Sequence, residues 1–208
     1  MKKLRVNRMA FSPFIWGLIA PQGIREQILN TPEDGLVEQA AYRTGTISAL
    51  DAGELRAIVE AFEPKVVAEV GTYIGRSTRA MAMGMRDGLI YTCDASNDIK
   101  LPAMYGATVE QFPMTSSTDM FRALVERGVR VDMFYIDGRL APEDVGLMQK
   151  LSATPLVVLD DFEGIEKGVA NAMLLGNAFG QTHFLIYPRD SGKTALYLPA
   201  SALEFASQ

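Results

Sequence analysis

Short apolar runs alternate with segments of helical composition over most of this chain, and this alternation limits the folds it can adopt. The runs that read as buried strands are "VVAEV" at 66–70, "LIYTC" at 89–93, "VDMFYI" at 131–136 and "LVVLD" at 156–160, with "TVEQF" at 108–112 as a weaker fifth. Nearly continuous apolar strands that are separated by helices are typical of a parallel sheet covered on both faces.

The segments between these runs have helical periodicity. They are "RSTRAMAMGMR", "SSTDMFRALVERG", "PEDVGLMQKLS" and "GIEKGVANAMLL". A further amphipathic helix is predicted before the first run, because Asp51 and Glu54 form a capping signal and apolar residues follow at helical spacing. Those apolar residues are Leu55, Ile58, Val59 and Phe62, and the helix is expected to end before Pro64.

The end of the chain has a different pattern. "THFLIYP" at 182–188 and "TALYLP" at 194–199 read as two strands joined by a short turn. Strands joined this closely must be antiparallel, because a parallel pair needs a long crossover. We therefore predict a doubly wound α/β fold with a mostly parallel, Rossmann-like sheet and a C-terminal antiparallel hairpin.

Length and composition favour one globular unit with an appendage. The chain has 208 residues, of which 48% are hydrophobic and 22% charged, enough for a sizeable core. Residues 1–48 are irregular and interrupted by Pro13, Pro21 and Pro32, so we expect an N-terminal helical cap or lid there. Residues 49–208 then form the main domain.

Charge and cysteine content exclude several classes of partner. A net charge of -5 is unsuited to nucleic acid, and the single Cys93 cannot form an internal disulfide or a cysteine metal cluster. The N-terminus has the basic-then-apolar order of a secretory signal, but Ser12 and Pro13 interrupt the apolar part. That part is also shorter than the ~20 residues that span a bilayer. We expect a cytoplasmic protein without a membrane partner.

Acidic residues stand at the ends of four predicted strands. Parallel sheets of this kind bind ligands beyond the carboxyl ends of their strands. A helix cap or simple solvation explains any one of these acids, but together they favour a site. The residues at these ends are Glu69 with the loop from Gly71 to Gly75, then Asp94, Asp137, Asp160 and Asp161.

The glycine loop does not match the usual nucleotide-binding patterns. A dinucleotide loop needs a glycine where Tyr73 stands, and "SGKT" at 191–194 has only the tail of a Walker loop. Asp94 is well placed to accept hydrogen bonds from both hydroxyls of a ribose. The acid before the loop could face a cation such as an ammonium or a sulfonium.

"AEVGTYIGRSTRAMA" resembles the first motif of class I S-adenosylmethionine-dependent methyltransferases. Its E-x-G-x-Y-x-G-x-S form is similar to that of the catechol and caffeoyl-CoA type of O-methyltransferase, and antibiotic-sugar methyltransferases share the later motifs. The resemblance runs from about residue 48 to the end, through "LDAGELRAIVEAFEPKVVAEVG", "LIYTCDAS", "SSTDMFRAL", "VDMFYIDG" and "PLVVLDDFEGIEKGV".

The resemblance implies a cofactor site and a metal site. S-adenosylmethionine would contact Glu69, Gly71, Tyr73, Gly75 and Ser77 with its methionine part, Asp94 with its ribose, and Ser117 and Thr118 with its adenine. Asp137, Asp160 and Asp161 match the family's metal ligands. Three carboxylates suit Mg²⁺ or another hard divalent cation better than zinc. A helix N-cap is the competing interpretation of Asp161.

The implied reaction is methylation of a hydroxyl on a small acceptor, with a metal holding and acidifying that hydroxyl. Leu140 and Arg139 stand where such enzymes carry a general base, so that base is missing from both positions. Asp137 and Lys167 are the catalytic candidates. His183 is a further substitute for the base, but its place in an apolar strand favours a core residue. A metal-independent methyltransferase with another acceptor and a non-catalytic cofactor-binding module both stay open.

The N-terminal aromatic residues allow a further set of interpretations. Phe14, Trp16 and Tyr42 could line the acceptor pocket, but ordinary core packing or a homodimer contact explains them better. The Met-rich stretch at 81–85 is expected to fill the core.

Overall fold

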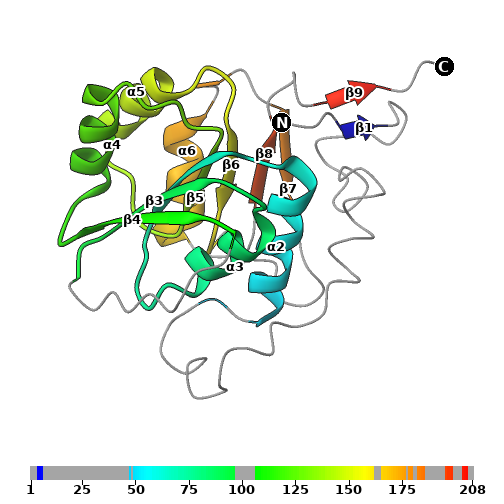
Figure 1. Cartoon of the computed structure of the whole chain (residues 1–208). Coiled ribbons are helices and arrows are strands. Elements are labelled where there is room, and N and C mark those ends of the chain that lie inside the picture. The colour runs from blue at the N-terminus through cyan, green and yellow to red at the C-terminus, as the bar shows by residue number, and fades with distance from the viewer. Residues whose placement is uncertain are drawn as a thin grey trace.

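The computed structural model describes residues 4–6, 47, 49–96, 106–161, 165–176, 178–179, 182–185, 195–198 and 203–205. Within this part of the chain, two short strands come from opposite ends of the sequence. Strand β1 (Leu4–Val6) pairs in parallel with β9 (Leu203–Phe205), beside the main body of the molecule (Figure 1).

The main sheet has seven strands in the order β4-β3-β2-β5-β6-β8-β7. They are β2 (Val66–Val70), β3 (Leu89–Asp94), β4 (Thr108–Pro113), β5 (Met133–Ile136), β6 (Leu156–Leu159), β7 (Thr182–Leu185) and β8 (Ala195–Leu198). The first five pair in parallel, which confirms the predicted α/β class. Strand β8 is antiparallel to β6 and β7. The turn between β7 and β8 lies outside the described residues, so the hairpin itself stays a prediction.

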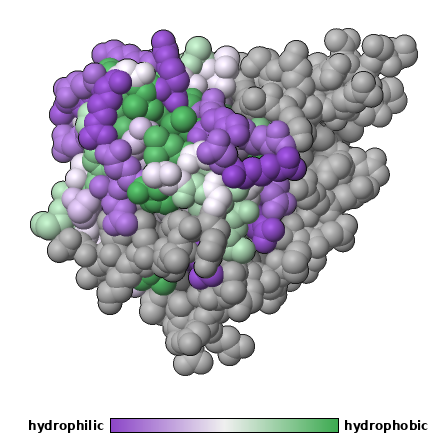
Figure 2. Space-filling model, viewed as in Figure 1, coloured by the Kyte–Doolittle hydropathy of each residue, from purple (hydrophilic) through white to green (hydrophobic). Residues whose placement is uncertain are grey.

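Helices cover both faces of this sheet (Figure 1). They are α2 (Ala49–Phe62), α3 (Arg76–Gly84), α4 (Ser117–Glu126), α5 (Pro142–Leu151), the π-helix η3 (Ile165–Val169) and α6 (Ala170–Leu175). One buried cluster joins α2 and α3 to the sheet, and a second joins α4, α5 and α6 to its other face. Successive strand residues point to opposite faces, and each face therefore buries its own apolar set. Figure 2 shows hydrophilic residues around the outer side of the α4 and α5 region.

Two predicted helices differ in detail from the sequence pattern. Helix α2 begins at Ala49, so Asp51 lies in its first turn and is buried instead of forming the cap. Its apolar face packs as predicted, with Ile58, Val59 and Phe62 fully buried. The segment expected as one helix near 164–175 divides into η3 and α6. Short π-helical turns are frequent at functional sites, and Lys167 lies in this one.

Several predictions fall on residues that the structure does not describe. These are the helical cap at 1–48, of which only β1 and Ile47 are described, the aromatic residues Phe14, Trp16 and Tyr42, and "SGKT" at 191–194. In the Met-rich stretch, Met81 and Met85 are buried in the core, as predicted. Among the described residues, the helices are too short or too polar to cross a membrane.

Candidate functional site

A cleft of about 560 Å³ opens at the carboxyl ends of the parallel strands. Its walls come from the ends of β2 and β3, the start of α4, the loop after β5 and the π-helix η3. Ligand sites of small molecules have volumes of roughly 300–1,000 Å³, so the cleft can hold one. The predicted site residues that line it are Gly71, Tyr73, Asp94, Ser117, Asp137 and Lys167.

Gly71 brings the loop after β2 against the loop after β5. Its φ is +98°, and a Cβ built there would lie 3.1 Å from the carbonyl carbon of Asp137 and from the nitrogen of Gly138. An L side chain rarely adopts this φ, and here it would also press on neighbouring backbone. The Gly71 N–H donates to the Cys93 carbonyl at 2.9 Å, which ties the loop to β3. Gly75, also at positive φ, is the N-cap residue of helix α3.

Asp94 is held at the cleft by backbone donors. Its Oδ2 accepts from the N–H of Tyr73 at 2.7 Å, and its Oδ1 accepts from the N–H of Ser96 at 2.8 Å. Each carboxylate oxygen has further lone-pair capacity, so the pair can still accept two ligand hydroxyls. This fits the ribose contact that the sequence predicts.

Glu69 does not reach the cleft. Its carboxylate is fully buried, with Oε1 accepting from Ser77 Oγ and Oε2 from Thr78 Oγ1, both at 2.5 Å. Burial raises the pKa of Glu69, although these hydroxyl donors lower it. Both Glu69 and Ser77 therefore lie behind the loop and hold β2 to α3. Neither side chain lines the cleft, so the cofactor contact that the sequence predicts for them has no direct support here and stays a prediction.

Ser117 and Thr118 share one buried carboxylate, which the sequence analysis missed. Asp144 accepts from both hydroxyls at 2.6 Å and from the N–H of Ala141 at 2.8 Å. Ser117 lines the cleft, whereas Thr118 does not. The only sequence signal for Asp144 is its place in the acidic first turn of α5, after Pro142.

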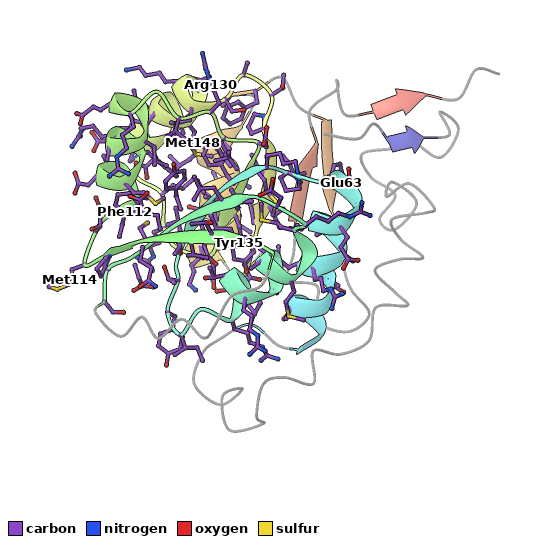
Figure 3. All side chains as sticks on the ribbon, in the orientation of Figure 1. Glu63, Phe112, Met114, Arg130, Tyr135 and Met148 are labelled. Carbon is purple, nitrogen blue, oxygen red and sulfur yellow. The ribbon has the colours of Figure 1, made fainter. Side chains whose placement is uncertain are left out.

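The predicted metal ligands are separated by a lysine. Lys167 Nζ lies 2.7 Å from Asp161 Oδ2 and 3.2 Å from Asp137 Oδ1. Asp160 faces the core: its Oδ2 accepts from the hydroxyl of Tyr135 at 3.1 Å. Figure 3 shows Tyr135 within the sheet. Asp161 has a positive φ of 52°.

Burial is the largest influence on the pKa values of Asp137, Asp160 and Lys167. Burial raises the pKa of Asp137 to about 7. The negative charge of Asp161 also raises this pKa, whereas the positive charge of Lys167 lowers it. Burial also raises the pKa of Asp160 to about 7, and the charge of Asp137 adds to this. For Lys167, burial lowers the pKa, but the hydrogen bond to Asp161 and the charge of Asp137 outweigh it and raise the pKa overall. The two neighbouring carboxylates thus favour the ammonium form of Lys167 over the neutral amine that a general base requires.

The three aspartates as placed do not fit a shared metal ion. Within the described part of the chain, no three acidic, histidine or cysteine side chains are arranged to hold one. Asp160 Oδ1 is buried without a hydrogen-bond partner, as a ligand atom could be, but Asp160 does not line the cleft. The position between Asp137 and Asp161 is taken by the ammonium of Lys167.

The positions of four further residues bear on catalysis. Leu140 is buried, and its N–H donates to Asn171 Oδ1. His183 lies on β7, the outer strand of the sheet, three places from β5. Burial raises the pKa of Cys93 to about 12, so its thiol at the cleft is not a ready nucleophile. Arg139, also missed as a lining residue, is exposed at the cleft.

Comparison with known proteins supports the fold. No family model matches the sequence, and no curated protein matches it. Among solved structures, the chain is similar to the O-methyltransferase TomG from Streptomyces achromogenes, involved in tomaymycin synthesis and in complex with S-adenosylmethionine. The TM-score is 0.54 at 17% identity, over 77% of this chain and 85% of that one.

Two further structures give the same result. An O-methyltransferase from Bacillus cereus in complex with S-adenosylhomocysteine has a TM-score of 0.55 at 16% identity, over 76% of this chain and 86% of that one. A protein from Staphylococcus aureus described as a caffeoyl-CoA O-methyltransferase has a TM-score of 0.53 at 14% identity, over 77% and 88% of the two chains. The chain therefore has the Rossmann-like fold of O-methyltransferases, as the sequence resemblance implies.

Proposed function

We propose that this protein is an S-adenosylmethionine-dependent O-methyltransferase that methylates a hydroxyl of a small molecule. The observation that carries this proposal is Asp94 at the cleft, fixed by the N–H groups of Tyr73 and Ser96 beside the Gly71 loop. The fold is that of O-methyltransferases solved with this cofactor or its product. Fold alone does not determine activity, so the site carries the argument.

The cofactor supplies a methyl group on a positively charged sulfur. On this proposal Asp94 accepts hydrogen bonds from the two ribose hydroxyls, and Ser117 lies beside the adenine. Gly71, which has no side chain, keeps the backbone close to the methionine part. Tyr73 is partly exposed and lines the same wall of the cleft.

The acceptor enters on the side of Asp137, Arg139 and Lys167. Its hydroxyl oxygen forms a bond to the methyl carbon while the carbon–sulfur bond breaks and sulfur keeps the electron pair. The hydroxyl proton passes to the carboxylate of Asp137, which leaves a methyl ether and S-adenosylhomocysteine. The protein mainly aligns the two reactants and excludes water.

Metal dependence is the part of the sequence prediction with least support from the described contacts. A hard divalent cation would need oxygens of Asp137, Asp160 and Asp161 around one point, and Lys167 instead contacts two of these residues. This favours methyl transfer to the acceptor hydroxyl without a metal ion. A cytoplasmic location and a homodimer remain proposals that rest on the sequence.

Calorimetric titration with S-adenosylhomocysteine tests the cofactor half of this proposal. We expect binding by the wild type and at least tenfold weaker binding by Asp94→Asn, because one ribose-facing oxygen becomes a donor. Asp87→Asn is the matched control, since it makes the same charge change at a residue that lies before β3, away from the cleft. No binding at millimolar ligand would contradict the proposal.

Methyl transfer is tested separately with labelled S-adenosylmethionine and a panel of hydroxylated aromatic compounds and sugars. Transfer to oxygen in any of them supports the enzyme. Cofactor binding without transfer to any acceptor would favour the binding-module alternative. Transfer to nitrogen or sulfur alone would contradict the choice of acceptor atom.

A further inference from the structure

Two of the carboxylates predicted to bind a metal, those of Asp137 and Asp161, already contact the ammonium group of Lys167. Lys167 reaches Asp161 Oδ2 at 2.7 Å and Asp137 Oδ1 at 3.2 Å, so its ammonium lies between them. The backbone explains how it arrives there. Lys167 lies in η3, the π-helical turn that follows the end of β6, and the loops after β5 and β6 carry the two aspartates.

Lys167 also faces the cleft. It is among the lining residues, together with Asp137, and its side chain is 39% exposed. An ammonium has three N–H donors, and the two aspartates take two of them. The third donor is thus available to a ligand oxygen in the cleft, within the part of the chain that the structure describes.

The charge and geometry of this group differ from those of a divalent ion. A divalent cation between carboxylates accepts electron pairs from several oxygens at once. Lys167 instead provides one positive charge and one directed hydrogen-bond donor at the same place. It can neutralise the aspartates and orient an acceptor oxygen, but it offers no coordination shell for two vicinal oxygens.

We propose that the ammonium of Lys167 takes the place of a divalent cation in this protein, binding Asp137 and Asp161 and positioning the acceptor oxygen by its third N–H. The positioning of the acceptor oxygen rests on the proposed methyl transfer. The exclusion of a metal ion from the two aspartates does not depend on it. The proton and methyl group move as described above, and Lys167 takes no part in the proton transfer.

Binding of Mn²⁺ tests the exclusion without any activity measurement. Free Mn²⁺ is followed by its electron paramagnetic resonance signal while wild type, Lys167→Met and Lys150→Met are titrated. We expect no binding by the wild type at millimolar Mn²⁺ and one ion bound at least tenfold more tightly by Lys167→Met, whose aspartates have lost their cation. Lys150→Met removes the same charge from α5, outside the cleft, and should behave as the wild type.

Asp161→Asn in the Lys167→Met background identifies the ligands of that ion, and its Mn²⁺ binding should be lost. One Mn²⁺ bound per wild-type chain would overturn the inference. So would the failure of Lys167→Met to gain binding while its circular dichroism shows a folded chain. If that variant does not fold, Lys167→Gln replaces it, and the wild-type titration decides in any case.

The titration with S-adenosylhomocysteine separates this inference from the proposed function. If the wild type binds both Mn²⁺ and the nucleoside, only the role proposed for Lys167 is refuted, and the proposed function stands. Failure to bind the nucleoside would refute the proposed function and the acceptor role, while exclusion of Mn²⁺ from the aspartates would still be decided by the resonance signal.

Discussion

Ser77 Oγ donates a hydrogen bond of 2.5 Å to Glu69 Oε1, and both side chains are buried. The bond joins the end of strand β2 to the first turn of α3 across the glycine loop. An acid that precedes a glycine loop is therefore not necessarily a ligand-binding group. Here the carboxylate fixes the position of the loop from behind.

The pH dependence of stability should reveal this buried carboxylate. Because the pKa of Glu69 is raised above its ordinary 4.5, the native state holds a proton that the unfolded chain has released at the same pH. The free energy of unfolding contributed by this group therefore falls as pH rises from about 4.5 towards the native pKa. Each pH unit of that interval costs about 1.4 kcal/mol.

Glu69→Gln should reduce that loss, since glutamine does not titrate. Urea unfolding at several pH values between 5 and 8 measures it, with Glu126→Gln at the end of α4 as the matched control. Equal pH slopes for wild type and Glu69→Gln would show that the raised pKa of Glu69 does not contribute to stability.

Gly71→Ala should destabilise the protein by roughly 1–3 kcal/mol, because its φ is unfavourable for an L residue. The added methyl group would also press on Asp137 and Gly138, and affinity for S-adenosylhomocysteine should fall with stability. Thermal unfolding with and without the nucleoside measures both. A variant as stable as the wild type would mean that the loop relaxes at no cost.

Gly146→Ala is the matched comparison for a glycine without such a role. Gly146 lies inside α5, and a Cβ there meets no atom within 4 Å. Alanine should stabilise the helix by roughly 0.5–1 kcal/mol through its higher propensity. The sign of the change in thermal midpoint thus separates the two positions, and a loss of stability at 146 would contradict the described packing.

Asp144→Ala should lower the free energy of unfolding by roughly 3 kcal/mol, since it leaves buried hydroxyls of Ser117 and Thr118 without their acceptor. Ser117→Ala removes only one donor and should cost about 1 kcal/mol. Chemical denaturation of both variants and of the double variant measures their coupling. Additive effects would contradict a shared hydrogen-bond network.

Arg56→Ala should change stability only slightly. Arg56 lies in α2, which covers the other face of the sheet from α4 and α5. Arg56 forms an exposed pair with Glu60 within α2, at 2.7 Å and with 43% of the arginine side chain accessible. Pairs of this kind contribute roughly 0.3–0.5 kcal/mol. The thermal midpoint should therefore change little, and less in 1 M salt. A large loss would show that Arg56 has a further structural role.

The local patterns of the sequence determined the elements and the edge at which the site forms. Apolar runs such as 66–70 and 89–93 became parallel strands, because nearly continuous burial suits a sheet covered on both faces. Parallel strands end at the same edge, so Asp94 and Asp137 line one cleft although 43 positions separate them in the sequence. Both conclusions follow from periodicity and strand direction.

Only the tertiary structure decided which of those acids face the cleft and what neutralises them. Glu69 turns inward because Ser77 and Thr78 offer it donors, and Asp160 turns towards Tyr135. Lys167 meets Asp137 across 30 residues because the chain bends through a π-helical turn after β6. Side-chain direction and ion pairing depend on partners that are remote in sequence, and no local pattern contains them.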